Sequence, residues 1–166
     1  MVFRHFHVIR RSEVTKKIGR FDVLESYDWV NVIAIDNNQN VVMVKQYRHG
    51  ADEITLEIPG GAVDLGEDKL VAAKRELREE TGHTSDEWHF LGEVTPNPAF
   101  LNNRCATYLA LNCEKTHELQ LDAFEEIEVE LHPMSEVEKM LADGRIHHAL
   151  VVAGFYYYSR FQNKAN

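Results

Sequence analysis

The stretch Gly61–His83, GAVDLGEDKLVAAKRELREETGH, brings three glutamates close together at Glu76, Glu79 and Glu80. Residues three and four apart are neighbours on an α-helix, so the three carboxylates share one face and repel one another. A hard divalent cation with oxygen ligands removes that repulsion. Ala72, one turn before Glu76, has a small side chain that would leave room for the ion. The pattern therefore predicts a cation site on the face of a helix.

The helix that carries these glutamates is expected from Leu65 to Thr81 and is closed by Gly82, a residue type favoured directly after a helix end. Leu70, Ala73 and Leu77 lie at helical spacing on an adjacent stripe. This stripe can pack against a sheet and would hold the acidic face at a fixed height above it.

A solvated helix with weak ion pairs is the alternative, because Arg75 and Arg78 alternate with the glutamates. The glycines in front of the helix, Gly60, Gly61 and Gly66, favour the cation site. They form a tight turn that can bring a backbone carbonyl to a shared ligand, a freedom that a merely solvated helix does not need.

Length and composition indicate one soluble domain. The chain has 166 residues with 44% hydrophobic content, and its formal net charge of −9 disfavours nucleic acid and anionic membranes as partners. Cys105 and Cys113 lack the spacing of a zinc site, and no segment has the apolar length of a signal peptide or a membrane span. We therefore expect a cytoplasmic protein.

Hydrophobic periodicity and turn residues predict a mixed α/β domain. The segments 29–35 and 41–47 flank the turn-favouring run DNNQN and are expected to form a β-hairpin of buried strands. Ser135 is the expected N-cap of a helix that ends at Ala142, and a last helix is expected over about 148–161. The remaining expected strands are residues 2–9, 21–27, 55–58, 89–94, 105–111 and 126–132.

Two pairs of histidines are candidate metal ligands, His5 with His7 and His147 with His148. His5 and His7 fall on one face of an expected strand. Neither pair has a third ligand at a recognisable spacing, so we do not expect a metal site at either pair.

The acidic stretch resembles the Nudix box, which is a glycine, five residues, Glu, seven residues, and then Arg-Glu-aliphatic-any-Glu-Glu-any-Gly followed by an aliphatic residue. His83 replaces that final aliphatic residue, a departure that concerns packing after the helix rather than metal ligands. The matching positions are Gly61, Glu67, Arg75, Glu76, Leu77, Glu79, Glu80 and Gly82.

The resemblance implies that the helix binds divalent cations, usually Mg²⁺ with Mn²⁺ as a possible substitute, which clamp a diphosphate. Glu76 and Glu80 correspond to direct ligands. Glu79 corresponds to a ligand through water or in a second metal site, with a catalytic role, and the carbonyl of Gly60 to a further ligand.

The other box positions correspond to supporting residues. By resemblance, Arg75 orients the glutamates in the catalytic group, and Glu67 ties the loop to the helix. Gly61 and Gly82 are structural positions of the box. The family's fold is an α+β arrangement in which a mixed β-sheet is sandwiched between helices.

Segments outside the box resemble the ADP-ribose pyrophosphatase and nucleoside-diphosphate-sugar branch. Members of that branch carry a similar Gln-Tyr-Arg and Glu-x-Pro before the box, here QYRHG and LEIPGG, and a proline about fifteen residues after it, here Pro98 or Pro96. Arg48 and Glu57 are therefore expected to bind substrate, Arg48 through the diphosphate, which a planar guanidinium suits.

Two further residues are candidates for substrate binding. Trp29, at the start of an expected strand, can stack on a nucleobase, with core packing as the alternative. Arg104 can contact a phosphate or sugar, with a surface ion pair as the alternative.

The N-terminal residues 1–26 are expected to form a small antiparallel β-sheet separate from the domain of residues 27–166. In the resembled branch such a sheet crosses to a second subunit. The resemblance therefore implies a homodimer and a role for this segment in dimerisation.

The resemblance implies metal-dependent hydrolysis of the diphosphate bond of ADP-ribose or a related nucleoside diphosphate sugar. The general base is expected at Glu125 or Glu126, in DAFEEIEVE before a late strand. Two alternatives use the same fold: a nucleoside triphosphate pyrophosphohydrolase that cleans the nucleotide pool, and a sensor that binds ADP-ribose-like ligands without hydrolysis.

Overall fold

A mixed eight-stranded β-sheet forms the centre of the chain in the computed structural model, which describes residues 3–121 and 126–165. The strand order is β10-β4-β3-β9-β7, and β5, β6 and β8 pair with β4, β3 and β9 respectively. The β3–β9 pairing is parallel, and the other strand pairings in the described part of the sheet are antiparallel. The strands are β3 (Trp29–Asp36), β4 (Asn40–Arg48), β5 (Glu53–Glu57), β6 (Gly60–Ala62), β7 (His83–Thr84), β8 (Glu87–Val94), β9 (Cys105–Lys115) and β10 (Ile127–Pro133).

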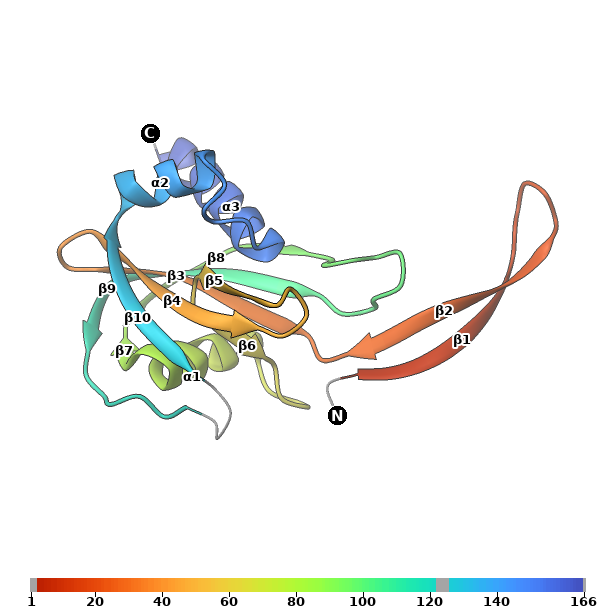
Figure 1. Ribbon diagram of the computed structural model, residues 1–166, viewed down its shortest axis with the longest axis horizontal. Coiled ribbons are helices and arrows are strands. Elements are labelled where there is room, and N and C mark those ends of the chain that lie inside the picture. Colours follow the sequence, from red (N-terminus) through yellow and green to blue (C-terminus); the bar gives the residue numbers. More distant parts are fainter. Residues whose placement is uncertain (1–2, 122–125, 166) are drawn as a thin grey trace.

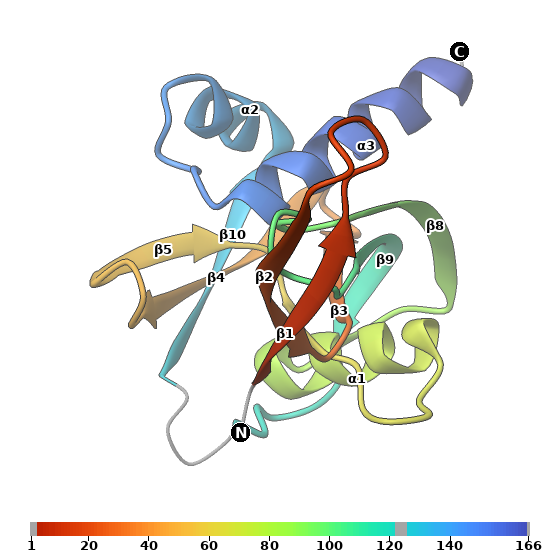
Figure 2. The same ribbon diagram turned by 90° about the vertical axis from the view of Figure 1, so that its right-hand side faces the viewer.

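Helices cover both faces of this sheet. Figures 1 and 2 show α1 (Lys69–Thr81) on one face, and α2 (Met134–Ala142) and α3 (Ala149–Ala165) on the other. The expected α+β fold, a mixed sheet between helices, is therefore confirmed.

The central strand β3 supplies side chains to the cores on both faces because successive residues of a strand point to opposite sides. Val32 and Ala34 are fully buried against α1, together with Ala73 and Leu77 of that helix. Ile33 and Ile35 point the other way, into the cluster formed with α2 and α3. This packing fixes α1 against the sheet, so the exposed side of α1 is held in a defined position.

The acidic helix begins later than the sequence predicts. It starts at Lys69 rather than Leu65, because the Asp68 side chain accepts hydrogen bonds from the backbone N–H groups of Leu70 and Val71 at 2.9 and 3.3 Å. This is the bonding of a helix N-cap. The preceding residues form a loop in which Gly66 has a φ of +83°.

The expected N-cap of the next helix is also wrong. Helix α2 begins at Met134, with Pro133 at the N-cap position and no hydrogen bond from a capping side chain. Strand β10 ends at Pro133, so the chain passes directly from strand into helix and Ser135 lies inside the first turn.

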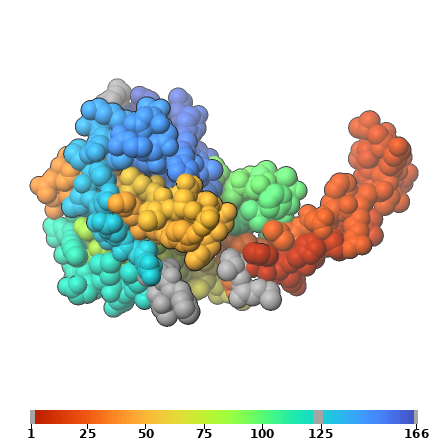
Figure 3. All heavy atoms as spheres, in the orientation of Figure 1, coloured from red at the N-terminus to blue at the C-terminus, as the bar shows by residue number. Residues whose placement is uncertain are grey.

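Strands β1 (Phe3–Arg11) and β2 (Ile18–Ser26) form a separate two-stranded antiparallel sheet, as expected. Figures 1 and 3 show this hairpin projecting away from the rest of the molecule. It is anchored near its end by Leu24, whose N–H donates to the carbonyl of Phe100 at 2.7 Å and whose carbonyl accepts from Asn102 at 3.3 Å.

Gly82 closes α1 in a left-handed conformation with a φ of +73°. Its N–H donates to the carbonyl of Arg78 at 2.8 Å, and its own carbonyl accepts from Thr116 and His117 at 2.9 and 3.0 Å. A Cβ added at Gly82 would overlap the backbone oxygen of His117, which has no side-chain freedom to move away. The position therefore needs glycine for two reasons, conformation and space.

We expect Gly82→Ala to lower the free energy of unfolding by about 3 kcal/mol, of which roughly 1–2 kcal/mol is the left-handed conformation and the rest the overlap. Gly144→Ala is the matched control, because Gly144 has a φ of +82° and a Cβ there meets nothing within 4 Å. Urea denaturation of Gly144→Ala measures the cost of the left-handed conformation. The additional loss in Gly82→Ala measures the cost of the overlap with His117. Equal losses would contradict the role given to His117.

Candidate active site

The glutamates of α1 lie against the short strand β6. The N–H of Gly60 donates to Oε2 of Glu80 at 2.9 Å, and the Glu80 side chain is almost completely buried. A Cβ added at Gly61 would overlap the carboxylate of Glu76, so that carboxylate rests directly on the glycine backbone. The structure thus brings two of the expected metal ligands together at the two glycines that precede the helix.

Arg75 binds the acidic groups on both sides of it. Its Nε and one terminal nitrogen lie 3.1 and 2.9 Å from the two carboxylate oxygens of Glu67, a bidentate pair. Its other terminal nitrogen donates to Glu76 at 2.6 Å and to Glu79 at 3.4 Å. A further bond to the carbonyl of Ala62 at 2.9 Å joins this network to β6.

This network changes the pKa values of its members. The hydrogen bonds from Arg75 lower the pKa of Glu67, and the bond to Glu67 raises the pKa of Arg75 despite partial burial. Both groups are therefore charged at neutral pH. Glu67 also accepts from the N–H of Asp64 at 3.0 Å, so the loop before the helix is tied to Arg75 through one carboxylate.

The donor set on α1 suits a hard divalent cation. Glu76, Glu79 and Glu80 offer carboxylate oxygens on one face, and Gly60 adds a backbone group beside Glu80. Mg²⁺ takes oxygen ligands, and one or two carboxylates with a substrate phosphate are its usual partners. Ala72 does not line this face as the sequence suggested; it is fully buried in the core beneath α1.

Partly buried Arg48 and buried Glu57 form an ion pair on the neighbouring strands β4 and β5. Nε and a terminal nitrogen of Arg48 donate to the two oxygens of Glu57, both at 2.7 Å, and the hydroxyl of Thr55 donates to Glu57 at 2.5 Å. Burial by itself would raise the pKa of Glu57, but these hydrogen bonds outweigh it and lower the pKa. In this structure the guanidinium of Arg48 is held by a carboxylate, a bond the sequence did not predict.

The lowered pKa of Glu57 predicts a pH-dependent contribution to stability. Because the folded pKa lies below the unfolded value of about 4.3, the contribution is complete above that pH and is lost as pH falls through the folded pKa. We expect Glu57→Gln to lower the free energy of unfolding by about 2 kcal/mol at pH 7, since it breaks a buried pair in which Arg48 keeps some contact with water. The difference from the parent chain should shrink as pH falls below about 4.

Urea unfolding across this pH range checks the prediction. The control is Glu53→Gln, on the same strand but half-exposed and paired with His147 at 3.0 Å, for which we expect a change within about 0.5 kcal/mol. A loss for Glu57→Gln that is the same at pH 3 and pH 7 would contradict the electrostatic cause.

Trp29 and Arg104 lie side by side where β3 and β9 begin. The N–H of Trp29 donates to the carbonyl of Arg104 at 2.8 Å, and the indole is partly buried. The Arg104 side chain is more than half exposed and lies 3.3 Å from Glu93. The surface ion pair considered as the alternative for Arg104 is thus present.

Lys69, the first residue of α1, bridges two acidic groups that sequence analysis did not assign to the site. Its Nζ lies 2.8 Å from Asp28 and 2.6 Å from Glu93. Burial opposes ionisation of Asp28, but the bonds from Lys69 and from the N–H of Arg104 lower its pKa. The one signal for this network in the sequence is Asp28, the polar residue directly before Trp29. Its partners Lys69 and Arg104 come from distant parts of the chain, so the sequence alone does not reveal them.

A cavity of about 620 Å³ lies between the N-terminal hairpin and the loop that leads into α1. It reaches both Glu67 of the Arg75 network and Lys69 of the second network. Its lining includes Phe3, Tyr27, Asp28, Leu65, Glu67 and Lys69. The acidic helix therefore begins at the wall of a hollow large enough for a small organic molecule.

Three other sequence predictions have different outcomes. Glu125 lies outside the described residues, and Glu126 is exposed directly before β10. Pro96 is half-buried and Pro98 is exposed in the loop between β8 and β9. His83, which departs from the box, is buried with its Nδ1 3.0 Å from the carbonyl of Thr81, so an imidazole occupies the place of the expected aliphatic side chain.

Comparison with known proteins identifies the family. The sequence model of the NUDIX domain matches residues 28–155. The chain is 30% identical over 152 residues to an ADP-ribose pyrophosphatase of Mycobacterium tuberculosis, an alignment that covers 88% of this chain and 73% of that protein. It is 33% identical over 129 residues to a methanol dehydrogenase activator of Bacillus methanolicus, covering 77% and 70% of the two chains.

The fold agrees with this relationship. The crystal structure of an ADP compounds hydrolase superimposes with a TM-score of 0.86 over 99% of this chain and 88% of that one, at 19% identity. The chain therefore belongs to the NUDIX domain family. Its resemblance to the ADP-ribose pyrophosphatase branch is confirmed, and it is an enzyme of that family. Among the described residues, no helix has the length and apolar character needed to cross a membrane.

Proposed function

We propose that the chain hydrolyses the diphosphate bond of ADP-ribose or a related nucleoside diphosphate sugar, giving a nucleoside monophosphate and a sugar phosphate. The observation that carries this proposal is the set of carboxylates on α1, held by Arg75 and by the backbone of β6. The 30% identity to an ADP-ribose pyrophosphatase supports the choice of substrate class.

Glu76 and Glu80 would hold Mg²⁺, with Mn²⁺ as a possible substitute, and Glu79 would contribute through water or at a second ion. The bound cation would supply charge neutralisation for the diphosphate and acidify a water molecule. Arg75 keeps Glu76 and Glu79 in place and limits their mutual repulsion. The protein thus contributes position and electrostatics, which carry most of the catalysis in phosphoryl transfer.

Arg48, Glu57, Trp29 and Arg104 are proposed to serve the substrate. Because Glu57 binds Nε and one terminal nitrogen of Arg48, its proposed part is to position the guanidinium for a phosphate. The Trp29 ring and the nearby Arg104 would contact the base, sugar or phosphate from the ends of β3 and β9.

The substrate class is tested by measuring phosphate-monoester release from ADP-ribose, other nucleoside diphosphate sugars and nucleoside triphosphates, with Mg²⁺ and with a chelator. We expect Mg²⁺-dependent cleavage that favours the diphosphate sugars. Cleavage of triphosphates alone would support the pool-cleaning alternative, and binding of ADP-ribose without hydrolysis would support the sensor.

Loss of the general base has its own expected result. Either Glu125→Gln or Glu126→Gln should lower kcat by roughly 10²–10⁴-fold with little change in KM, because a positioned base acts in the transition state. Steady-state kinetics at saturating Mg²⁺ checks this, with Glu118→Gln as an exposed control upstream of the same segment. If both variants keep more than about a hundredth of the activity, the base lies elsewhere.

We also propose that residues 1–26 form a dimerisation element beside the domain of residues 27–166, and that the chain is a homodimer. The hairpin exposes large apolar side chains that one protomer leaves in water, since Ile9 and Ile18 are 70% and 72% exposed and Phe21 is 53% exposed. Light scattering coupled to size exclusion tests this, with Phe21→Ser expected to raise the monomer fraction. A monomer at micromolar concentration would contradict the proposal.

A cytoplasmic location is proposed from cysteine use. Cys105 and Cys113 are free, buried thiols, and burial raises the pKa of each to about 12. Such thiols pack as small apolar groups and need no oxidising compartment.

A further inference from the structure

The N-terminal hairpin brings His5, His7 and Asp22 together on one face. In the β1–β2 pairing, His7 lies directly opposite Asp22, while His5 lies opposite Leu24. Residues two apart on a strand point to the same side, and diagonal neighbours across an antiparallel pair remain within reach of long side chains. The third ligand that the sequence did not reveal is therefore supplied by the neighbouring strand.

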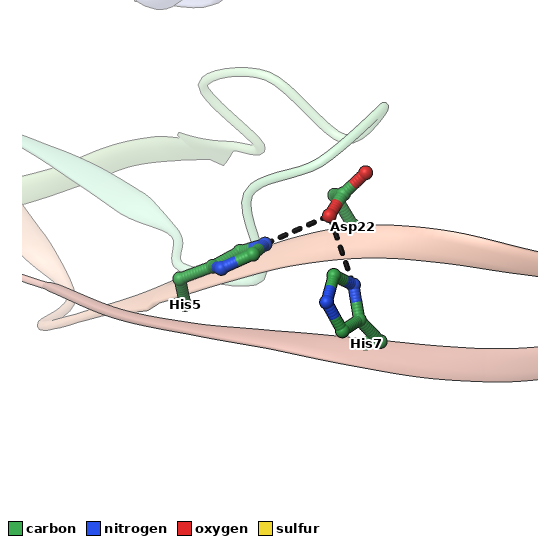
Figure 4. A group of neighbouring side chains, drawn as sticks. All are labelled: His5, His7 and Asp22. Carbon is green, nitrogen blue, oxygen red and sulfur yellow. Dashed lines mark hydrogen bonds and ion pairs between the residues drawn. The ribbon is translucent and has the colours of Figure 1, made fainter.

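Both imidazoles already point at the same oxygen atom. Nε2 of His5 lies 2.8 Å from Oδ1 of Asp22, and Nδ1 of His7 lies 2.9 Å from that same oxygen, as Figure 4 shows. The three ligand atoms all lie within 4.8 Å of one another. The side chains are 50%, 36% and 71% exposed, so an ion can reach them from solvent.

We propose that His5, His7 and Asp22 bind a Zn²⁺ ion, with water completing the coordination. Zn²⁺ binds imidazole nitrogen and carboxylate oxygen at about 2.0–2.2 Å in tetrahedral geometry, which separates neighbouring ligand atoms by roughly 3.4 Å. Small side-chain rotations from the present arrangement reach that separation. The bound ion would join β1 to β2 in the hairpin that projects from the domain.

This site differs chemically from the carboxylates of α1. Imidazole ligands favour Zn²⁺ and its transition-metal neighbours, whereas an all-oxygen set favours Mg²⁺. Excess Mg²⁺ can therefore occupy the α1 carboxylates while leaving the hairpin histidines available. The proposal does not depend on the substrate of the enzyme.

The competing explanation is a surface cluster in which the carboxylate of Asp22 binds the two imidazoles directly, by a hydrogen bond to His5 and an ion pair with His7, and holds no metal. The hydrogen bond from His5 and the nearby His7 already lower the pKa of Asp22 without any metal. The two explanations differ in one measurable respect. Only the proposed metal site predicts saturable binding of Zn²⁺ at a fixed ratio of ions to chains.

The test is calorimetric titration of Zn²⁺ into the untagged chain of residues 1–166 in the presence of excess Mg²⁺. We expect one Zn²⁺ per chain, and an affinity at least about tenfold weaker in His7→Asn and in Asp22→Asn. His89→Asn is the matched control, because His89 is also a strand histidine 3.3 Å from a carboxylate, that of Glu87, and is 38% exposed. The Zn²⁺ affinity of His89→Asn should equal that of the parent chain. Circular dichroism should show the same fold in every variant.

Cobalt substitution gives a second measurement. Co²⁺ bound at the hairpin should give visible absorption typical of tetrahedral coordination, which His5→Asn should abolish and Glu80→Gln should leave in place. Equal Zn²⁺ affinity in His7→Asn and the parent chain, or loss of the Co²⁺ absorption in Glu80→Gln alone, would overturn the proposal. One ion for every two chains would also overturn it, because the ion would then bridge protomers rather than the two strands of one hairpin.

Discussion

Replacing Glu80 with glutamine is expected to lower kcat by roughly 10³-fold at saturating Mg²⁺. Glu80 is 4% exposed and accepts a hydrogen bond from the N–H of Gly60, so its carboxylate cannot swing away from the glycine turn. Glutamine has the same shape and can still accept that bond. The variant therefore removes a negative charge, worth several kcal/mol of cation and transition-state binding, with little change in packing.

Steady-state kinetics with a Mg²⁺ titration measures this effect, with thermal unfolding to verify the fold. The control is Glu138→Gln, an exposed glutamate of α2 on the opposite face of the sheet, which should keep the parent kcat. A near-normal kcat for Glu80→Gln at saturating Mg²⁺ would remove Glu80 from the ligand set.

Gly61→Ala is expected to lower kcat by roughly 10²-fold, because a displacement of about 1 Å in a reacting group can cost that much. The added Cβ would overlap the carboxylate of Glu76. That carboxylate ends a flexible side chain, so it can move aside and the fold can survive. Moving it also strains its 2.6 Å bond with Arg75, so the whole acidic face is disturbed.

Kinetics and urea denaturation together separate the two consequences. We expect a large loss of kcat with a change in unfolding free energy of about 1 kcal/mol or less. Gly50→Ala is the control, because a Cβ at Gly50 meets nothing within 4 Å and its φ is not in the left-handed region. An unchanged kcat in Gly61→Ala would mean that Glu76 is not needed where the structure places it.

The helix that carries the site could be predicted closely, and its error is instructive. Ala73 and Leu77 of its packing stripe and its end at Gly82 were correct, because they depend on local periodicity and on a single residue type. Leu70, the third residue of the expected stripe, is only partly buried. The start of the helix was wrong by four residues, Leu65 against Lys69. An N-cap at Asp68 competes with a helix that begins earlier, at Leu65, and hydrophobic periodicity alone does not decide between the two starts.

The polar networks could be predicted only in part. A resemblance in the sequence suggested that Arg75 lies among the glutamates, and the bonds to Glu67, Glu76 and Glu79 agree with that placement. The sequence predicts that Arg48 and Glu57 bind substrate, but it does not predict the bidentate pair between them. Their pairing depends on the register of β4 against β5, which a pattern within one strand does not encode.

The sequence by itself determined the box register, the alternation that buries β3 on both faces, and the family to which the chain belongs. These features follow from residues close together in the chain, where spacing and side-chain chemistry suffice. Only the tertiary structure decided that β3 and β9 run parallel, that Lys69 joins Asp28 to Glu93, and that Asp22 completes the histidine pair of the hairpin. Each of these joins residues separated by a turn or by several elements, so it depends on strand order and register rather than on local sequence.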